Sequence, residues 1–496
     1  MNARIVRLTY VATALIFVLV VMTTYWQTWA APGLADRQDN SVKRVAEFTI
    51  DRGLIFSFEP RKRLARNRER EIDGKTLFFR RYPQGALTAH VVGYSTVGRS
   101  RTGLERSLND YLTGATGNLS TLVDKALDEL RGRPVQGNDV VTTLDLEGQQ
   151  VAMDELGTRC GAVFAFDPRT GEVLVMASSP SFDPNLAEES FERISRITAD
   201  CRPAAPLVNR ASDGLYVPGS TFKVITASAD LESKEFTPDS TFVDPGYCTV
   251  YGKRVNNFDT SSPFGTITLE NALAYSVNSV FCNVGLKLGA KAILSQARRF
   301  GFYERPPLET PVDERAPSGL YRNGELYVPA HDSDVDAGRM AFGQERMLVT
   351  AQQMAMVAGA IGVRGRLMET QVVDRIVAPN GRVVTRSRPT LVRRAVSKET
   401  AQAVARMMRL AVERGTGTAA QIPGYSVGGK TGTGETGIPG SNTTWFIAFA
   451  SRDEESPAEL AIAVVLERQS GTGGTTAAPI ARAVMEAILS STRENP

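Results

Sequence analysis

Ser220 and Lys223 are the first pair of side chains in this sequence that could do chemistry together. They lie three residues apart in Ser-Thr-Phe-Lys, directly after Pro218-Gly219. A Pro-Gly pair favours a turn, and positions three apart on a following helix share one face. Burial and the positive end of the helix dipole both lower the pKa of a lysine in such a place. A neutral Lys223 could then take the hydroxyl proton of Ser220, which makes Ser220 the candidate nucleophile.

A second motif, Ser276-Val277-Asn278, supplies another hydroxyl and an amide. The hydroxyl of Ser276 can relay a proton to a leaving amine. The amide of Asn278 can donate one hydrogen bond to a substrate and accept another.

The third motif is Lys430-Thr431-Gly432-Thr433, which predicts an edge strand beside a cleft. Lys430 supplies fixed positive charge, and the hydroxyls of Thr431 and Thr433 can hold a substrate carboxylate. Gly432 lets the substrate approach the strand backbone closely. Each of the first two patterns is expected about once by chance in a chain this long. It is therefore the presence of all three, in this order, that favours a function.

The composition argues against several other kinds of site. The chain has two histidines, far apart, and four cysteines without Cys-x-x-Cys spacing. We therefore expect no metal and no cofactor. A net charge of +3 over 496 residues does not indicate nucleic-acid binding. The cysteines could form up to two disulfides, of which Cys248–Cys282 is the favoured one, but four reduced cysteines remain open.

The N-terminus predicts a membrane anchor. Arg4 and Arg7 precede an uncharged run, 8–34, whose centre is strongly apolar. Roughly 20 apolar residues span a bilayer, and the arginines should remain in the cytoplasm. We therefore predict a cytoplasmic tail over 1–9 and a single-pass signal anchor over 10–30, with the remainder extracytoplasmic. A cleaved signal peptide is the alternative.

The elements that must position the three motifs form an α+β fold. Strand patterns come from both ends of the extracytoplasmic part, with helices between them, which favours an antiparallel sheet flanked by helices. A helix starting after Ser397 and stopping before a Gly415 cap is also expected. The expected strands are 140–144, the hairpin 161–166 and 172–177, and the hairpin 443–450 and 460–466. The other expected helices are 119–131, 149–156, 349–360 and 477–489.

With its three motifs and their surroundings, the chain resembles a penicillin-binding protein. The resemblance extends over almost everything after the anchor, including 140–145, 180–185, 341–344 and 350–354. Asp51-Arg52-Gly53-Leu54-Ile55 and Gly103-Leu104-Glu105 resemble pedestal motifs of the monofunctional, class B group, for which we expect a structural role. The stretch 31–139 is too short for a glycosyltransferase domain, so the resemblance implies a non-catalytic, dimerisation-type pedestal over 31–139 and a transpeptidase domain over 140–492. Glu345 stands where many relatives have glycine.

The resemblance also implies an activity, cross-linking of peptidoglycan in cell-shape or cell-division synthesis. A D,D-transpeptidase of this kind would form an acyl-enzyme on Ser220, release terminal D-Ala and be acylated by β-lactams. Ser220 and Thr433 would supply the backbone N–H groups of an oxyanion hole. The implied partner is a membrane glycosyltransferase of the shape, elongation, division and sporulation family.

Three alternatives remain open. A D,D-carboxypeptidase would pass the same acyl group to water. A β-lactamase or β-lactam sensor shares the scaffold, but a class D enzyme usually has valine in place of Asn278, and no Glu-x-x-Leu-Asn pattern lies between the second and third motifs. An inactive scaffold of a wall-synthesis complex is the alternative from another class.

Overall fold

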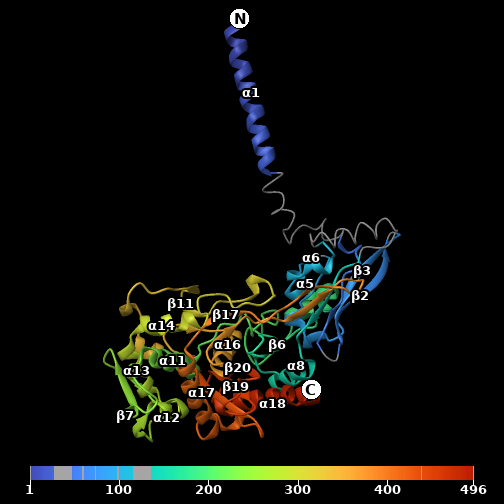
Figure 1. Cartoon of the computed structure of the whole chain (residues 1–496). Helices are drawn as coiled ribbons and strands as arrows, with labels where there is room; N and C mark the ends of the chain where they lie inside the picture. The colour runs from blue at the N-terminus through green and yellow to red at the C-terminus, as the bar shows by residue number, and fades with distance from the viewer. Residues whose placement is uncertain are drawn as a thin grey trace.

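The computed structural model describes residues 2–26, 47–58, 61–72, 74–97, 100–115, 136–436, 438 and 440–494. The expected helix over 119–131 lies outside these residues. Helix α1 (Asn2–Thr24) begins before the predicted anchor. Its part Arg4–Thr24 has a mean hydropathy of 2.4, is long and apolar enough to cross a membrane, and has none of its surface buried (Figure 1).

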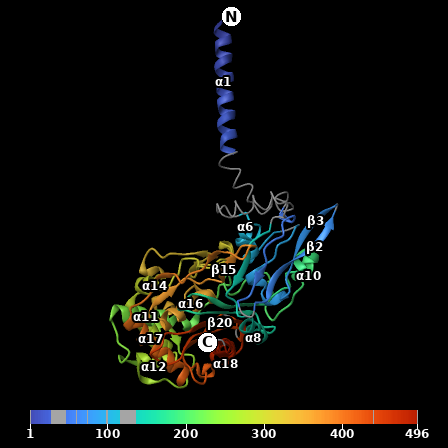
Figure 2. The same cartoon turned by 45° about the vertical axis from the view of Figure 1, so that its right-hand side comes forward.

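The pedestal is built on a sheet of six strands with the order β16-β15-β4-β1-β2-β3. Strand β1 pairs parallel with β4, and the other neighbours are antiparallel. Two of the strands, β15 and β16, come from late in the chain, and the sequence patterns did not predict them here. Figure 2 shows β15 reaching toward the end of the body where β2 and β3 lie. The strands are β1 (Ile55–Phe56), β2 (Arg63–Ile72), β3 (Lys75–Arg81), β4 (Asp139–Thr142), β15 (Val373–Val377) and β16 (Val383–Arg386).

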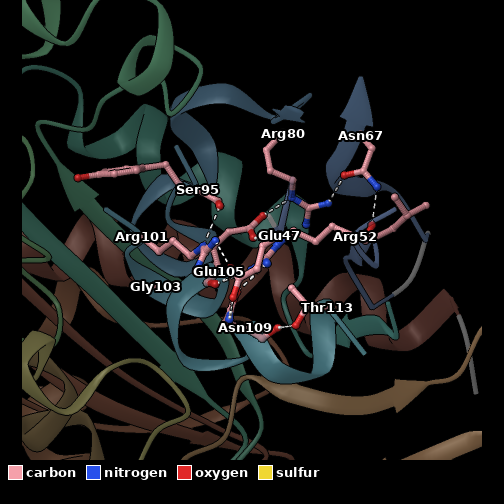
Figure 3. Close-up of polar contacts among 12 residues, drawn as sticks. Glu47, Arg52, Asn67, Arg80, Ser95, Arg101, Gly103, Glu105, Asn109 and Thr113 are labelled. Carbon is pink, nitrogen blue, oxygen red and sulfur yellow. Dashed lines mark hydrogen bonds and ion pairs between the residues drawn. The ribbon is translucent and has the colours of Figure 1, made fainter. Parts of the chain in front are cut away.

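A buried ionic cluster holds this pedestal together (Figure 3). Glu105 on α5 (Gly103–Ser107) is fully buried, and its carboxylate accepts from Arg52 Nε at 2.8 Å and from Arg80 Nε at 2.6 Å. Burial by itself raises the pKa of Glu105, but the charges of Arg80 and Arg52 outweigh it and lower that pKa. Both pedestal motifs thus meet in one structural contact. Asn67 extends the cluster by accepting from Arg80.

The same short helix also ties the pedestal to the rest of the molecule. The backbone N–H of Gly103 donates to both carboxylate oxygens of Glu314, at 3.0 and 3.2 Å. Arg106 forms an ion pair with Asp313 at 2.8 Å. One turn of helix therefore contributes both to the ionic cluster inside the pedestal and to the contact with the domain that contains the three motifs.

The domain that carries the three motifs, and that we expect to be the catalytic domain, is organised around a five-stranded antiparallel sheet with the order β18-β19-β20-β5-β6. Alternate side chains of β5 enter different cores, with Phe164 and Phe166 in one and Val163 and Ala165 in the other. Helix α16 belongs to the first core, while α8 and α18 belong to the second, so the sheet is covered on both faces (Figure 1). The strands are β18 (Ser426–Glu435), β19 (Asn442–Ser451), β20 (Leu460–Gln469), β5 (Gly161–Phe166) and β6 (Val173–Ser179).

Helices separate the two ends of this sheet in the sequence, as expected. The larger ones are α8 (Leu146–Leu156), α11 (Lys223–Ser233), α13 (Asn278–Leu288), α14 (Ala290–Arg299), α16 (Ala351–Gly362), α17 (Lys398–Glu413) and α18 (Gly473–Glu494). The shorter ones are α4 (Ala89–Val92), α6 (Asn109–Leu112), α9 (Leu186–Glu189), α10 (Phe191–Ser195), α12 (Leu269–Ala274) and α15 (Ala337–Met340). The remaining strands are β7 (Thr241–Asp244), β8 (Tyr247–Val250), β9 (Lys253–Asn256), β10 (Gly265–Thr268), β11 (Gly319–Arg322), β12 (Glu325–Leu326), β13 (Met347–Leu348), β14 (Arg366–Met368) and β17 (Leu391–Arg394).

The predicted helix ends can be compared directly with the structure. Ser397 is the N-cap of α17, and its hydroxyl accepts from the N–H of Thr400. The predicted glycine cap is wrong by one position, because Arg414 is the C-cap and Gly415 follows it. Helix α16 starts at Ala351, later than predicted, because Thr350 caps it.

All four cysteines are paired. Cys248 on β8 is bonded to Cys282 on α13, which confirms the favoured pairing, and Cys160 is bonded to Cys201.

Candidate active site

The segment that carries Ser220 is folded by the turn predicted from Pro218-Gly219. Gly219 adopts φ +52°, and a 3₁₀ turn, η3 (Gly219–Phe222), leads directly into α11. The backbone N–H of Lys223 donates to the carbonyl of Ser220, so the two residues lie one helical turn apart. A Cβ atom at Gly219 would lie 2.6 Å from the carbonyl oxygen of Thr433. Only glycine therefore allows the Ser220 turn to lie this close to β18.

The ammonium nitrogen of Lys223 is fully buried and points at the second motif. Its Nζ donates to the carbonyl oxygen of Ser276 at 2.7 Å and to Oδ1 of Asn278 at 2.7 Å. The hydroxyl of Ser276 lies 3.3 Å from the same nitrogen. The ring of Phe281, 5.5 Å away, contributes to its burial. Two of the positions around Lys223 Nζ are thus occupied by oxygens that can only accept hydrogen bonds.

Ser276 lies in a tight turn between α12 and α13. Its φ is +62°, a left-handed conformation that non-glycine residues rarely adopt and that is found preferentially at functional sites. Its N–H donates to the carbonyl of Leu273, and that of Val277 donates to Ala272. The turn directs the backbone carbonyl and the hydroxyl of Ser276 toward Lys223.

Lys430 contacts the same hydroxyl from another element. It lies on β18, is fully buried, and its Nζ donates to Ser276 Oγ at 2.9 Å and to the carbonyl of Thr431 at 2.9 Å. The hydroxyl of Ser276 is therefore flanked by two lysines from α11 and β18. This places all three motifs around one hydroxyl group.

Burial changes the protonation of both lysines. It lowers the pKa of Lys430 to about 7, because the charged form loses its hydration. Burial and, second, the nearby charge of Lys430 lower the pKa of Lys223 well below its ordinary value. Lys430 is thus not a fixed positive charge, as the sequence motif suggested, but a group that titrates near neutral pH.

Strand β18 lies at the edge of the sheet, as predicted, and packs directly against the Ser220 segment. A Cβ atom at Gly432 would lie 2.7 Å from the carbonyl oxygen of Pro218. The Nε1 of Trp445 on β19 donates to the carbonyl of Val217 at 2.9 Å. Thr431 Oγ1 shares a hydrogen bond of 2.6 Å with Thr416 Oγ1, while Thr433 is partly exposed.

Other residues of this site were not identified from the sequence. Gly343, with φ +80°, packs against Gly219, whose N–H donates to the Gly343 carbonyl at 3.2 Å. Tyr216 and Val349 exchange two backbone hydrogen bonds of 2.9 Å just before the nucleophile turn. Glu345, where the resemblance led us to expect glycine, has φ +59°, a conformation that glycine adopts without strain. The resemblance over 341–344 was the signal that could have located the Gly343 contact.

Comparisons with known proteins agree with this arrangement. The family model for the penicillin binding protein transpeptidase domain matches residues 161–486, and that for the penicillin binding protein A dimerisation domain matches 52–140. The peptidoglycan D,D-transpeptidase PbpA of Mycobacterium tuberculosis is 32% identical, over 99% of this chain and 99% of the relative. The peptidoglycan D,D-transpeptidase MrdA of Acinetobacter baumannii is 29% identical, over 85% of this chain and 68% of the relative.

Solved structures show the same relationship. The ceftriaxone acyl-enzyme complex of penicillin-binding protein A from M. tuberculosis has a TM-score of 0.78 and 30% identity, covering 90% of this chain and 100% of the solved one. A D,D-transpeptidase domain from Eggerthella lenta has a TM-score of 0.74 and 32% identity, covering 89% of this chain and 98% of the solved one. Because the matches extend over both the pedestal and the catalytic domain, this chain belongs to the penicillin-binding proteins, in their monofunctional class B group.

Proposed function

We propose that this chain is a peptidoglycan D,D-transpeptidase that cross-links stem peptides through an acyl-enzyme on Ser220. The observation that carries the proposal is the environment of Lys223 Nζ. A neutral amine has two N–H bonds and one lone pair. In the neutral form, the two N–H bonds can serve the two shorter of its three contacts, the carbonyl oxygens of Ser276 and Asn278, rather than Ser276 Oγ at 3.3 Å. The lone pair is then left to act as a base.

Acylation begins when Ser220 Oγ attacks the carbonyl carbon of the penultimate D-Ala. As the new C–O bond forms, the hydroxyl proton passes to Lys223 Nζ. The negative charge that develops on the carbonyl oxygen is accepted by the backbone N–H groups of Ser220 and Thr433. The close approach of Gly219 to the carbonyl of Thr433 supports this pairing.

The C–N bond then breaks and terminal D-Ala leaves as an amine. Ser276 Oγ donates a proton to this nitrogen and is reprotonated from the lysines that flank it. The amine of a neighbouring stem peptide next attacks the Ser220 ester, and its proton returns by the same route. The new amide bond restores the Ser220 hydroxyl, so protons balance over the cycle.

The remaining motif residues hold the substrate. In its charged form, Lys430 attracts the terminal carboxylate, and Thr431 and Thr433 hydroxyls bind it. Gly432, which we expected to make room for the substrate, instead makes room for the carbonyl of Pro218 and so holds β18 against the Ser220 segment. The amide of Asn278 holds the peptide while also accepting from Lys223. No metal or cofactor takes part in this scheme.

We further propose how the chain is arranged at the membrane. Residues 1–9 are a cytoplasmic tail, 10–30 the uncleaved anchor, 31–139 the pedestal and 140–492 the extracytoplasmic transpeptidase domain. The apolar helix α1 and the two arginines before its centre support this topology. The partner is a membrane glycosyltransferase of the shape, elongation, division and sporulation family, contacted through the anchor and the pedestal.

A fluorescent penicillin tests the catalytic assignment on the full-length chain in detergent. We expect one stable covalent adduct, located on Ser220 by peptide mapping and lost in Ser220→Ala. Ser228→Ala is the matched control, because its hydroxyl lies on the same helix and bonds only within it, to the carbonyl of Val224. An adduct that survives Ser220→Ala would refute the assignment.

The same experiment separates the alternatives. A β-lactamase would release the adduct within the time of a normal turnover, and an inactive scaffold would form none. Transfer of the acyl group from a D-Ala-D-Ala peptide to water rather than to an added amine would indicate a carboxypeptidase.

A further inference from the structure

Asp244, at the end of β7, is a buried carboxylate that the proposed reaction does not use. It is 1% exposed and accepts hydrogen bonds from four residues. The donors are Ser279 Oγ at 2.5 Å, Asn257 Nδ2 at 2.8 and 3.0 Å, Gly246 N–H at 2.9 Å and Phe264 N–H at 2.9 Å. Burial alone raises the pKa of Asp244, but these bonds, that of Ser279 first, outweigh it and lower the pKa. Asp244 is therefore ionised at neutral pH.

The hydrogen bonds that Asp244 accepts connect it to the start of α13, where the second motif ends. Ser279, which is fully buried, donates its hydroxyl to Asp244 and its backbone N–H to Asn257 Oδ1 at 2.9 Å. Asn257 in turn donates to Asp244. One residue earlier, Asn278 Nδ2 donates to the carbonyl of Asn256 at 3.0 Å. Residues 241–268, which contain Asp244, are thus bonded to two consecutive residues of α13.

Asn278 and Ser276 are the groups that hold Lys223. The left-handed turn at Ser276 is strained, and such a conformation persists only where its surroundings fix it from several sides. We propose that Asp244 is a positioning residue that fixes Asn278, two residues after this turn, for acyl transfer, acting through Ser279 and Asn257. The inference rests on the proposed roles of Ser276 and Asn278.

The alternative is a purely structural role, in which Asp244 only stabilises the turn that follows it. The bond from the N–H of Gly246 to Oδ1 is of the kind by which aspartate stabilises turns. That turn requires neither Ser279 nor Asn257. A carboxylate that only accepts hydrogen bonds suits all the donors together. An amide would place an NH₂ group against either the three donors at Oδ1 or the two at Oδ2. The two roles therefore differ in whether Asp244 affects catalysis through Asn278.

The test uses the full-length chain in detergent and the kinetics of its acylation by a fluorescent penicillin, resolved into binding and the first-order acylation step. Asp244→Asn keeps the shape of the side chain but places its NH₂ group against groups that themselves donate hydrogen bonds. We expect it to slow the acylation step about tenfold while binding changes little. Asp259→Asn is the matched control, because Asp259 is exposed on the same segment and bonds only locally, to Ser261.

The double variant with Asn278→Ala separates positioning from general destabilisation. If Asp244 acts through Asn278, Asp244→Asn should change the acylation rate less than about twofold in the Asn278→Ala background. Ser279→Ala removes one donor to Asp244 with less risk to folding. It should lower the acylation rate by less than Asp244→Asn does, and its effect should likewise not add to that of Asn278→Ala. Melting temperatures report how far each variant is destabilised.

The inference is overturned if both Asp244→Asn and Ser279→Ala acylate at the wild-type rate. It is equally overturned if the losses multiply fully with that of Asn278→Ala. Ser220→Ala is measured in parallel. If that variant is still labelled, the proposed active site fails, whereas an inactive Ser220→Ala beside a fully active Asp244→Asn contradicts only the positioning role.

Discussion

Two buried lysines that contact one hydroxyl define this site at the scale of residues. A charged lysine is costly to bury. If these two side chains were exposed to solvent, both would be protonated at neutral pH. Here their Nζ atoms lie 3.3 and 2.9 Å from Ser276 Oγ. The protein therefore pays stability for groups that can exchange protons with a substrate, a trade-off expected at active sites.

Lys430→Met should raise stability and abolish function. The folded pKa of Lys430 is about 7 and its ordinary value is 10.5. Between these values the unfolded chain binds a proton that the folded chain does not, so stability due to this group rises with pH across that window. We expect the variant to melt at a higher temperature than wild type at pH 7, with the gain shrinking as the pH approaches 10.5. Acylation by penicillin should fall by at least about a hundredfold.

Thermal unfolding followed by circular dichroism between pH 7 and 10 measures the first effect. Lys398→Met is the matched control, because Lys398 is exposed at the start of α17. A melting temperature that is lower than wild type at pH 7 would contradict the buried-charge argument.

At the scale of elements, the short helix α5 performs two tasks that the sequence motifs do not separate. Glu105 joins α5 to Arg52 and Arg80 within the pedestal, while Gly103 and Arg106 join it to the loop that precedes β11. A helix of five residues has too few internal hydrogen bonds to be stable alone. Its conformation is therefore set by these contacts, and the pedestal motifs are structural.

Glu105→Gln should destabilise the chain without changing its chemistry. Loss of the carboxylate leaves two buried guanidinium groups without their counter-ion, which costs about 3–5 kcal/mol. Because the folded pKa of Glu105 is lowered, its contribution is present above the ordinary pKa and is lost as the pH falls through the folded value. The difference between variant and wild type should thus be full at pH 7 and shrink in acid.

Denaturant unfolding of the purified chain measures this free energy, and penicillin acylation below the melting temperature measures the chemistry. Glu69→Gln, an exposed position on β2, should leave both unchanged. Equal stability of Glu105→Gln and wild type would show that the cluster does not support the fold.

At the scale of the whole molecule, the apolar helix α1 and the folded body have separate tasks. None of the span Arg4–Thr24 is buried against the protein. The pedestal and catalytic domain share a sheet, because β15 and β16 complete the sheet that β1, β2 and β3 begin. The body is therefore expected to fold without α1, and the proposed anchor to determine where it works.

Removing residues 1–30 should release the protein from the membrane and abolish its co-purification with the proposed glycosyltransferase. The truncated chain should still form the Ser220 adduct, since no motif residue lies in α1. Membrane fractionation, mass spectrometry of the co-purified proteins and penicillin labelling measure the three outcomes. In a control variant, an unrelated apolar helix replaces the span, and this variant should be attached to the membrane again. Whether the partner co-purifies with it shows if the partner contacts the anchor itself. Full-length protein without any such partner in the membrane extract would contradict the proposal.

The sequence by itself was sufficient to find the three motifs and to predict the family and its activity, because the motifs are local patterns. Ser220 and Lys223 are one helical turn apart whatever surrounds them. The apolar runs 161–166 and 172–177 lie on either side of a turn signal, which predicts a hairpin. The antiparallel hairpins at both ends were predicted for this reason. So was the subclass, since the resemblance and the length of the stretch before residue 140 could both be obtained from the sequence alone.

Only the tertiary structure decided what depends on contacts between distant segments. The addition of β15 and β16 to the pedestal sheet has no local signal, because whether a strand joins a distant sheet depends on the strand that it pairs with. The lowered pKa of Lys430 requires complete burial, and the strained turn at Ser276 requires neighbours that no sequence spacing specifies. Asp244 belongs to the same class, since a carboxylate between two short strands becomes a positioning group only when folding brings the start of α13 against it.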